Sequence, residues 1–247
     1  MSARPRNAFL RSLSAEAFES IAPHLTSVEM EHGRILSEPG QRMEWVFFPE
    51  TCLLSILTNA QNGDSVETTM AGSEGALGLL EACGSGRSAA TTLIQVDGHA
   101  SRAPSQACKS LVRSSDDFAD KAYELFELQI AESRQSGLCQ ALHTVQTRLA
   151  RWLLESSERS AGRNPLPLTQ EFLGSMLGVQ RTTVTSFAVQ LQKAGLINYR
   201  RGSVTILDRE GLEARSCECR KVTVEERRRL SLEPIAGAGG HLSVVRN

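Results

Sequence analysis

The stretch from Gln170 to Val189, QEFLGSMLGVQRTTVTSFAV, has the spacing of a helix-turn-helix. In such a motif a short helix, a tight turn and a second helix pack on each other through a few apolar positions. The second helix is then free to enter a groove of DNA. The packing positions are apolar in this chain: Leu173, Leu177, Val179, Val184 and Phe187.

Three further residues fit the same motif. Gly174 stands where the two helices approach most closely, and Gly178 stands in the turn, where a positive φ favours glycine. Thr169 precedes the first helix, and its hydroxyl can accept a hydrogen bond from an amide two or three residues later. We therefore expect a capped first helix from Gln170 and a turn at Gly178.

The second helix presents a polar face when its apolar residues pack inward. This face carries short or fork-shaped donors and acceptors, which suit base edges and phosphates better than a core. For any single residue, a solvated helix face would look the same. For the segment as a whole we interpret the pattern as a DNA-binding surface made of Gln180, Arg181, Thr182, Thr185, Ser186 and Gln190.

A basic hairpin is predicted directly after this helix. The sequence LINYRRGSVTIL supplies two short strands, over residues 196–199 and 203–207. Arg200 and Arg201 precede Gly202 in the turn between them, as expected at a hairpin tip. Such a wing lies over the phosphate backbone, where it adds affinity without sequence information. The prediction is a winged helix-turn-helix.

Residues 168–213, LTQEFLGSMLGVQRTTVTSFAVQLQKAGLINYRRGSVTILDREGLE, resemble the Crp/Fnr family of transcription regulators. The resemblance extends more loosely over the rest of the chain, apart from its ends. It implies an α+β fold, in which a long helix joins an N-terminal antiparallel β-roll of the cyclic-nucleotide-binding type to the winged helix-turn-helix. It also implies a homodimer that has double-stranded DNA and RNA polymerase as partners.

The resemblance bears on individual positions of the recognition helix. Members of the family read bases with an arginine near the start of this helix, a place that Arg181 occupies. Thr182 stands where a glutamate is frequent, and Ser186 stands where some relatives carry a second arginine. We therefore expect an operator different from that of the best-known members.

Composition and charge agree with a soluble, cytoplasmic regulator. Of the 247 residues 40% are hydrophobic and 22% charged, and no run of about twenty apolar residues predicts a membrane helix. The N-terminus lacks the apolar core of a signal peptide. Residues 145–210 contain nine Lys or Arg and five Asp or Glu, so this part carries +4 and the remainder −5. A general nucleic-acid coat protein would be basic throughout, so this uneven distribution of charge favours a regulator.

The pattern along the chain predicts its domains. Residues 8–25 have helical spacing, and short apolar runs between turn residues predict antiparallel strands from 26 to 105. Residues 114–157 read as mostly helical. We assign residues 1–113 to a sensor roll, 114–144 to a connecting and dimerisation helix, 145–220 to the winged helix-turn-helix and 221–247 to a disordered, charged tail.

The candidate effector pocket lies in residues 72–92, GSEGALGLLEACGSGRSAATT. In cyclic-nucleotide-binding relatives this region supplies amides and an arginine for the phosphate and a glutamate for the ribose. Arg87 and Ser88 resemble the arginine end of that cassette, but Ala76 stands in the place of the glutamate and Glu74 is displaced by two positions. We expect an effector other than cyclic AMP, with Glu74, Arg87 and Ser88 as the pocket. A roll that binds nothing is the alternative, with Arg87 paired to an acidic neighbour.

No cofactor, metal or catalytic activity is expected. Some relatives hold an iron–sulfur cluster on N-terminal cysteines, but no cysteine precedes Cys52 here and no CxxC pair occurs. The triplet Cys217-Glu218-Cys219 could bind a metal or respond to oxidants, although isolated thiols after the last domain are more often inert. The five histidines are dispersed, and no nucleophile is grouped with a base. The rival to a DNA-binding regulator is a ligand-sensing module with a vestigial DNA-binding half.

Overall fold

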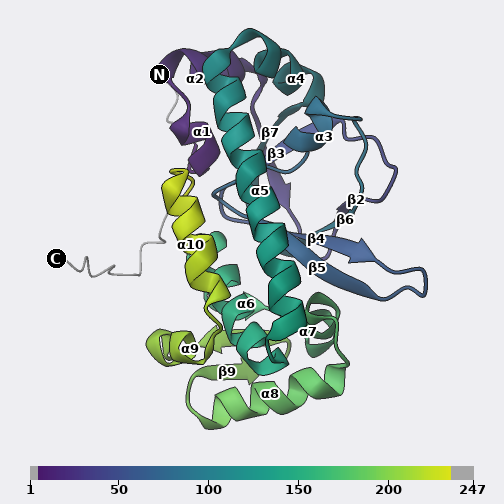
Figure 1. Cartoon of the computed structure of the whole chain (residues 1–247), viewed down its shortest axis with the longest axis vertical. Helices are drawn as coiled ribbons and strands as arrows, with labels where there is room; N and C mark the ends of the chain where they lie inside the picture. Colours follow the sequence, from purple (N-terminus) through teal and green to yellow (C-terminus); the bar gives the residue numbers. More distant parts are fainter. Residues whose placement is uncertain (1–4, 235–247) are drawn as a thin grey trace, which may run out of the picture.

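The first half of the protein is built from antiparallel strands with short helices beside them (Figure 1). The structure, a computed structural model, describes residues 5–234. Its elements in this half are α1 (Ala8–Ser12), α2 (Ala15–Ile21), η1 (Ala22–His24), β1 (Thr26–Met30), β2 (Ile35–Ser37), β3 (Trp45–Pro49), β4 (Leu53–Asn59), β5 (Ser65–Ala71), α3 (Leu79–Cys83), β6 (Thr91–Val96), β7 (Gly98–Pro104) and α4 (Ser105–Ser114).

Two antiparallel sheets make up the roll. One has the strand order β1-β7-β3 and the other β2-β6-β4-β5. Ile94 of β6 is fully buried in a cluster with Met30 and Leu54 inside the roll. On the outside, Phe48 of β3 stacks on Phe9 of α1 with 5.7 Å between the ring centroids. The apolar runs thus became strands because each has a buried side, and the predicted antiparallel β-roll is confirmed.

The second half begins with a long helix that runs along the side of the roll (Figure 1). Ser115 caps this helix by accepting from the amide of Phe118 at 3.3 Å. None of the helices in the described part of the chain is long and apolar enough to cross a membrane. The elements of this half are α5 (Asp116–Leu142), α6 (Val145–Arg159), β8 (Leu166–Pro167), α7 (Gln170–Leu177), α8 (Arg181–Lys193), β9 (Ile197–Arg200), β10 (Ser203–Ile206), α9 (Arg209–Arg215) and α10 (Cys219–Arg229).

A hydrophobic cluster joins the roll to α6 and to the helix-turn-helix. It combines Leu53 of β4 and Met70 of β5 with Leu153 of α6 and Leu173 of α7. All four side chains are almost fully buried. Because the apolar area buried in this cluster belongs to both halves, their relative position is part of the fold.

A buried ionic network lies beside this cluster. Arg159, at the end of α6, is 4% exposed, and its Nε donates to Glu74 Oε1 at 2.8 Å. Its Nη2 lies 3.1 Å from Glu132 Oε2 on α5. Glu132 also pairs through Oε1 with Arg227 of α10 at 2.8 Å. Although burial lowers the pKa of Arg159, the charges of Glu132 and Glu74 outweigh it and raise that pKa.

Helix α10 corrects the prediction of a disordered tail from residue 221. It packs alongside α5 (Figure 1), and Arg227 is only 2% exposed. Thr223 of the same helix donates to Glu155 Oε1 of α6 at 3.1 Å. The charged composition suggested a solvated segment, but the acidic partners lie on α5 and α6, far away in the sequence. The prediction is wrong for residues 221–234, and residues 235–247 lie outside the described part.

A buried carboxyl group connects the roll to α6. Glu67 of β5 is 7% exposed and accepts from Trp152 Nε1 at 2.7 Å, while its Oε2 has no hydrogen bond. Burial raises the pKa of Glu67 to about 7, although the hydrogen bond from Trp152 opposes the shift. The folded protein therefore holds this proton up to a higher pH than the unfolded chain does.

The network predicts that Glu132→Gln is strongly destabilising. It leaves Arg227 buried without its ion pair, whereas Arg159 keeps Glu74, so we expect a loss of about 3 kcal/mol in the free energy of unfolding. Glu127→Gln is the matched control, because Glu127 lies on the same helix and pairs with the exposed Arg229. Urea unfolding should show no measurable loss for the control. Equal effects of the two variants would contradict the network's importance.

Glu67 predicts a pH dependence of stability. Since its pKa rises from 4.5 to about 7 on folding, the stabilisation is complete below pH 4.5 and is lost as the pH rises through 7. Glu67→Gln should remove this slope and raise the stability at about pH 8 by up to about 3 kcal/mol. Urea unfolding at about pH 5 and pH 8 measures it, with the exposed Glu171→Gln as control. A slope that persists in Glu67→Gln would assign the dependence to another group.

Candidate nucleic-acid interface

The helix-turn-helix has the local geometry that its sequence predicts. Thr169 caps α7 by accepting from the amide of Phe172 at 3.1 Å. Helix α7 ends at Gly178, whose φ is +64°, a conformation that glycine adopts at no steric cost. A Cβ on Gly174 would lie 2.9 Å from the carbonyl oxygen of Val179, so only glycine allows this approach. These three predictions are confirmed.

The two helices of the motif pack on a hydrophobic cluster. Leu173 and Leu177 of α7 and Val184 of α8 are buried, as predicted, whereas Val179 and Phe187 are only half-buried at the edge of the cluster. Helix α6 packs against α7, because Trp152 of α6 lies edge-on to Phe172 of α7 with 6.3 Å between the ring centroids. This packing holds α8 in a fixed orientation at the end of the molecule (Figure 1).

One charged residue in α6 also serves the helix-turn-helix. Arg148 is 8% exposed, and its Nη2 donates to the carbonyl oxygen of Leu177 at 2.5 Å. It thereby satisfies one of the carbonyl groups that the C-terminal end of α7 leaves without a helical partner. The helix-turn-helix pattern does not include this residue, although an arginine inside the apolar run TRLARWLL is a detectable signal.

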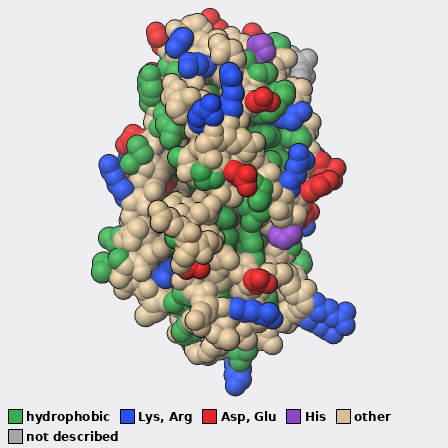
Figure 2. All heavy atoms as spheres, turned by 90° about the vertical axis from the view of Figure 1, so that its right-hand side faces the viewer, with side chains coloured by type: hydrophobic (Ala, Val, Ile, Leu, Met, Phe, Trp, Pro, Cys, Tyr) green, Lys and Arg blue, Asp and Glu red, His purple; other side chains and the backbone are tan. Residues whose placement is uncertain are grey.

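The predicted DNA-binding residues of α8 lie mainly on its outer face. Gln180, Arg181 and Thr182 are exposed at the start of the helix, and Ser186 and Gln190 are exposed further along it. Figure 2 shows Lys and Arg side chains projecting from the end of the molecule where α8 lies in Figure 1. The outer face of α8 is therefore exposed to solvent.

Thr185 differs from the other five residues. It is half-buried, and its Oγ1 donates to Gln170 Oε1 of α7 at 2.8 Å. The hydroxyl therefore links the two helices of the motif. In this arrangement the Thr185 hydroxyl orients α8, and its proton is not available for a hydrogen bond to a DNA base.

The wing is a three-stranded sheet with the order β8-β10-β9. Its tip contains Arg201 and Gly202, with φ of +52° and +75°. Strand β9 covers residues 197–200, one residue later than predicted, and β10 covers 203–206, which starts as predicted and ends one residue earlier. The reason is that Leu196 is buried after α8 and Arg200 pairs with Ser203 across the hairpin. Arg200 and Arg201 are both exposed.

The structure separates the three residues predicted as an effector pocket. Glu74 is 1% exposed and accepts from Arg159 and from the amide of Gly72. Ser88 is buried and donates to the carbonyl oxygen of Ala90 at 2.8 Å. Only Arg87 lines a cavity. The prediction is wrong for Glu74, because Arg159, distant in sequence, neutralises its charge.

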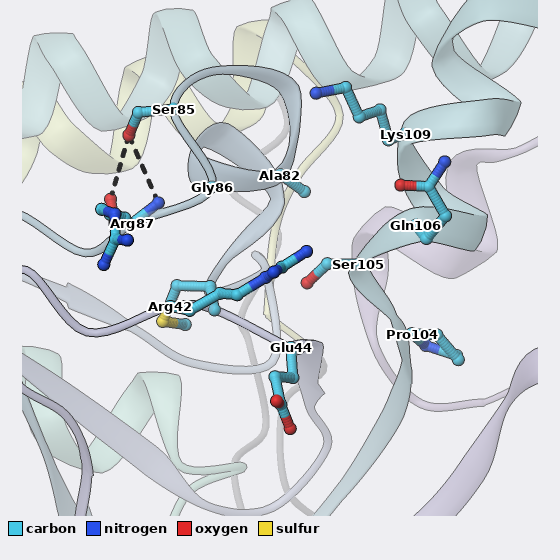
Figure 3. A pocket seen from close by; sticks show the side chains of 11 residues that line it. Arg42, Glu44, Ala82, Ser85, Gly86, Arg87, Pro104, Ser105, Gln106 and Lys109 are labelled. Atoms are coloured by element: carbon cyan, nitrogen blue, oxygen red, sulfur yellow. Dashed lines mark hydrogen bonds between the residues drawn. The ribbon is translucent and has the colours of Figure 1, made fainter.

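The cavity at Arg87 has a volume of about 400 Å³. Arg87 forms no ion pair with an acidic side chain of residues 5–234, and its Nη1 donates to the carbonyl oxygen of Gly40 at 2.7 Å. Arg42 and Lys109 reach over the same cavity from opposite sides, with Glu44 below them (Figure 3). Three basic side chains and one acidic side chain make its lining suitable for an anionic group.

Comparison with known proteins agrees with this geometry. Residues 147–215 match the family model of the Crp-like helix-turn-helix domain. A putative regulator of the Crp/Fnr family from Eubacterium rectale is 20% identical, with a TM-score of 0.66 over 85% of this chain and 98% of that chain. FixK2 from Bradyrhizobium japonicum is 16% identical, with a TM-score of 0.64 over 78% and 98%. No curated protein sequence matches the chain significantly.

A third solved structure, a Crp/Fnr-family regulator from Thermus thermophilus, is 20% identical, with a TM-score of 0.62 over 77% of this chain and 98% of that chain. At these identities the similarity shows the fold. The fold combines an N-terminal β-roll with a C-terminal winged helix-turn-helix, in which helix α8 has an exposed polar face. The chain contains a Crp-like helix-turn-helix domain and has the fold of the Crp/Fnr transcriptional regulators, as its sequence predicts.

Proposed function

We propose that this protein is a homodimeric, cytoplasmic, sequence-specific DNA-binding transcription regulator of the Crp/Fnr type. Its partners are double-stranded DNA and RNA polymerase, and it is not an enzyme. The observation that carries the proposal is the face of α8: Val184 and Leu191 on its inner side are buried in the cluster, while Gln180, Arg181 and Thr182 are exposed at its start. The N-terminal end of a recognition helix is the part that contacts base edges.

An apolar stripe on α5 supports the dimer. Tyr123, Ile130 and Leu138 are 58%, 48% and 43% exposed, and their spacing of seven and eight residues places them on one side of the helix. Gly137 continues the helix without a side chain and allows a second helix to approach closely. A two-fold pairing of α5 would bury this stripe. The two copies of α8 then have to meet successive major grooves, about 34–36 Å apart.

The environment of Glu74 supports an effector other than cyclic AMP. Glu74 is 1% exposed and its Oε1 is held by Arg159, so it is enclosed in the interior, and the side chain of Ala76 has no polar group. The cavity beside Arg87 is the place in the roll for an anionic effector. Such a ligand shifts the protein between two states only by its differential affinity for them.

The rival function is a ligand-sensing module with a vestigial DNA-binding half. A vestigial half would have no need of both a closely packed Gly174 and an exposed basic wing at Arg200 and Arg201. Both features are present, and they favour a DNA-binding regulator over a module with a vestigial DNA-binding half.

Arg181→Ala tests the recognition helix. We expect it to weaken specific binding by about 1–3 kcal/mol and to relax the preference at one base pair, because an arginine at this place reads a base edge. Fluorescence anisotropy with the protein's own upstream DNA and a scrambled duplex measures both quantities. Lys193→Ala, at the other end of α8, is the control and should keep the sequence preference. Unchanged affinity and preference in Arg181→Ala would show that this register of the helix is wrong.

Arg201→Asn tests the wing. Asparagine tolerates the positive φ of this residue, so the variant removes the charge and keeps the turn. We expect weaker binding to all sequences alike and a salt dependence whose slope falls by about one. Anisotropy titrations at several salt concentrations, with and without cyclic AMP, provide the test. A loss confined to the specific duplex would contradict a phosphate contact, and binding that requires cyclic AMP would contradict the proposed effector class.

A further inference from the structure

Four side chains suited to a metal ion meet where α5 ends and α10 begins. Cys139 lies in the last turn of α5, and His143 follows one turn later as its C-cap. Cys217 lies on the connection from α9 to α10, and Cys219 is the first residue of α10. The three sulfur atoms and a ring nitrogen of His143 all lie within 4.8 Å of one another. The thiols are buried, and the imidazole is 18% exposed.

The distances within this cluster approach those of a tetrahedral site. Cys139 Sγ lies 3.5 Å from Cys217 Sγ, and Cys219 Sγ lies 3.3 Å from His143 Nδ1. With Zn–S bonds of about 2.3 Å and Zn–N bonds of about 2.0–2.1 Å, tetrahedral ligands lie about 3.8 Å (S to S) and about 3.5 Å (S to N) apart. Small side-chain movements therefore suffice to seat an ion at the centre.

The surroundings provide what a metal-binding histidine needs. Nε2 of His143 lies 3.1 Å from Glu218 Oε1, so it can carry the proton and leave Nδ1 unprotonated toward the thiols. A carboxylate on the outer nitrogen is the common partner of a zinc-bound histidine, because it fixes the tautomer and the ring orientation. Glu218 stands between the two cysteines of the triplet. The triplet Cys217-Glu218-Cys219 therefore supplies two ligands and also the carboxylate that orients the histidine.

Charge also favours the ion. Three thiolates and one Zn²⁺ carry a net charge of −1. Arg151 is 9% exposed and interacts electrostatically with Cys139 and Cys217, and Arg148 lies close enough to do the same. These two cations offset the charge of a loaded site.

We propose that Cys139, His143, Cys217 and Cys219 bind one Zn²⁺ in a closed, structural site. A set of three cysteines and one histidine is typical of structural zinc, and four protein ligands leave no position open for catalysis. The sequence predicts no metal, because Cys139 and Cys217 are separated by 78 residues. The fold brings them together.

The site would connect the C-terminal helix to the output of the protein. It would fix the start of α10 against the end of α5. Arg148, beside the thiols, donates to the carbonyl oxygen of Leu177 at the end of α7. Loading of the site would therefore order the junction on which the helix-turn-helix rests.

The metal content of the full-length protein is the first test. The protein is purified under reducing conditions without chelators, and metals are measured by plasma mass spectrometry. The expected result is one zinc ion per chain. Metal-free protein titrated with Co²⁺ should show the visible absorption of tetrahedral cobalt thiolate. Iron in place of zinc, a failure to bind Co²⁺, or a Cys139–Cys217 disulfide under these conditions would overturn the proposal.

Variants assign the ligands. Cys217→Ser and His143→Ala should lose the zinc, whereas Cys83→Ser, a half-buried cysteine of α3 outside the cluster, should keep one ion per chain. Glu218→Gln should bind 10–100-fold more weakly, as expected for the loss of a carboxylate behind a histidine ligand. A chelator should lower the melting temperature of the parent protein and of Cys83→Ser, but not that of Cys217→Ser or His143→Ala. Full zinc content in Cys217→Ser would refute the site.

Discussion

The guanidinium of Arg159 is the group on which the arrangement of the molecule depends. It is buried, and its hydration is replaced by Glu74 from the loop after β5, by Glu132 from α5 and by the carbonyl oxygen of Met70. A buried arginine without such partners is very unfavourable, so the loop, α5 and α6 have to assemble together. Glu132 also accepts from Arg227, which brings α10 into the same assembly.

The backbone around Arg159 is adapted to this contact. A Cβ on Gly72 would lie 2.4 Å from the carbonyl oxygen of Arg159, and the amide of Ser73 donates to that same oxygen at 3.0 Å. The loop that precedes Glu74 thus touches both the side chain and the backbone at the end of α6. Because packed interiors respond to such displacements in discrete steps, a shift of this loop would require α6 to move with it.

The features that the sequence predicts correctly are local ones. Thr169, Gly174 and Gly178 act on neighbours within a few residues, so their roles follow from spacing and backbone preference alone. The features that it misses depend on residues far apart in the chain. Glu74 and Arg159 are 85 residues apart, and Glu132 and Arg227 are 95 apart. A single sequence shows each as an ordinary charged residue, because only the tertiary structure decides which charges are buried together.

Helix α6 is one of the elements that physically link the two ends of the protein. Its 15 residues span about 22 Å. Arg148 contacts the helix-turn-helix near one end, and Arg159 contacts the roll at the other. Arg151, between them, pairs with Glu155, and Glu155 accepts from Thr223 of α10. Burial disfavours the charged form of Glu155, yet Arg151, Arg227 and Arg159 together lower its pKa, so the helix carries one connected set of charges. Because Arg148 is bonded to the carbonyl oxygen of Leu177 and Arg159 to Glu74 and Glu132, a displacement of α6 relative to either end would break one of these buried contacts.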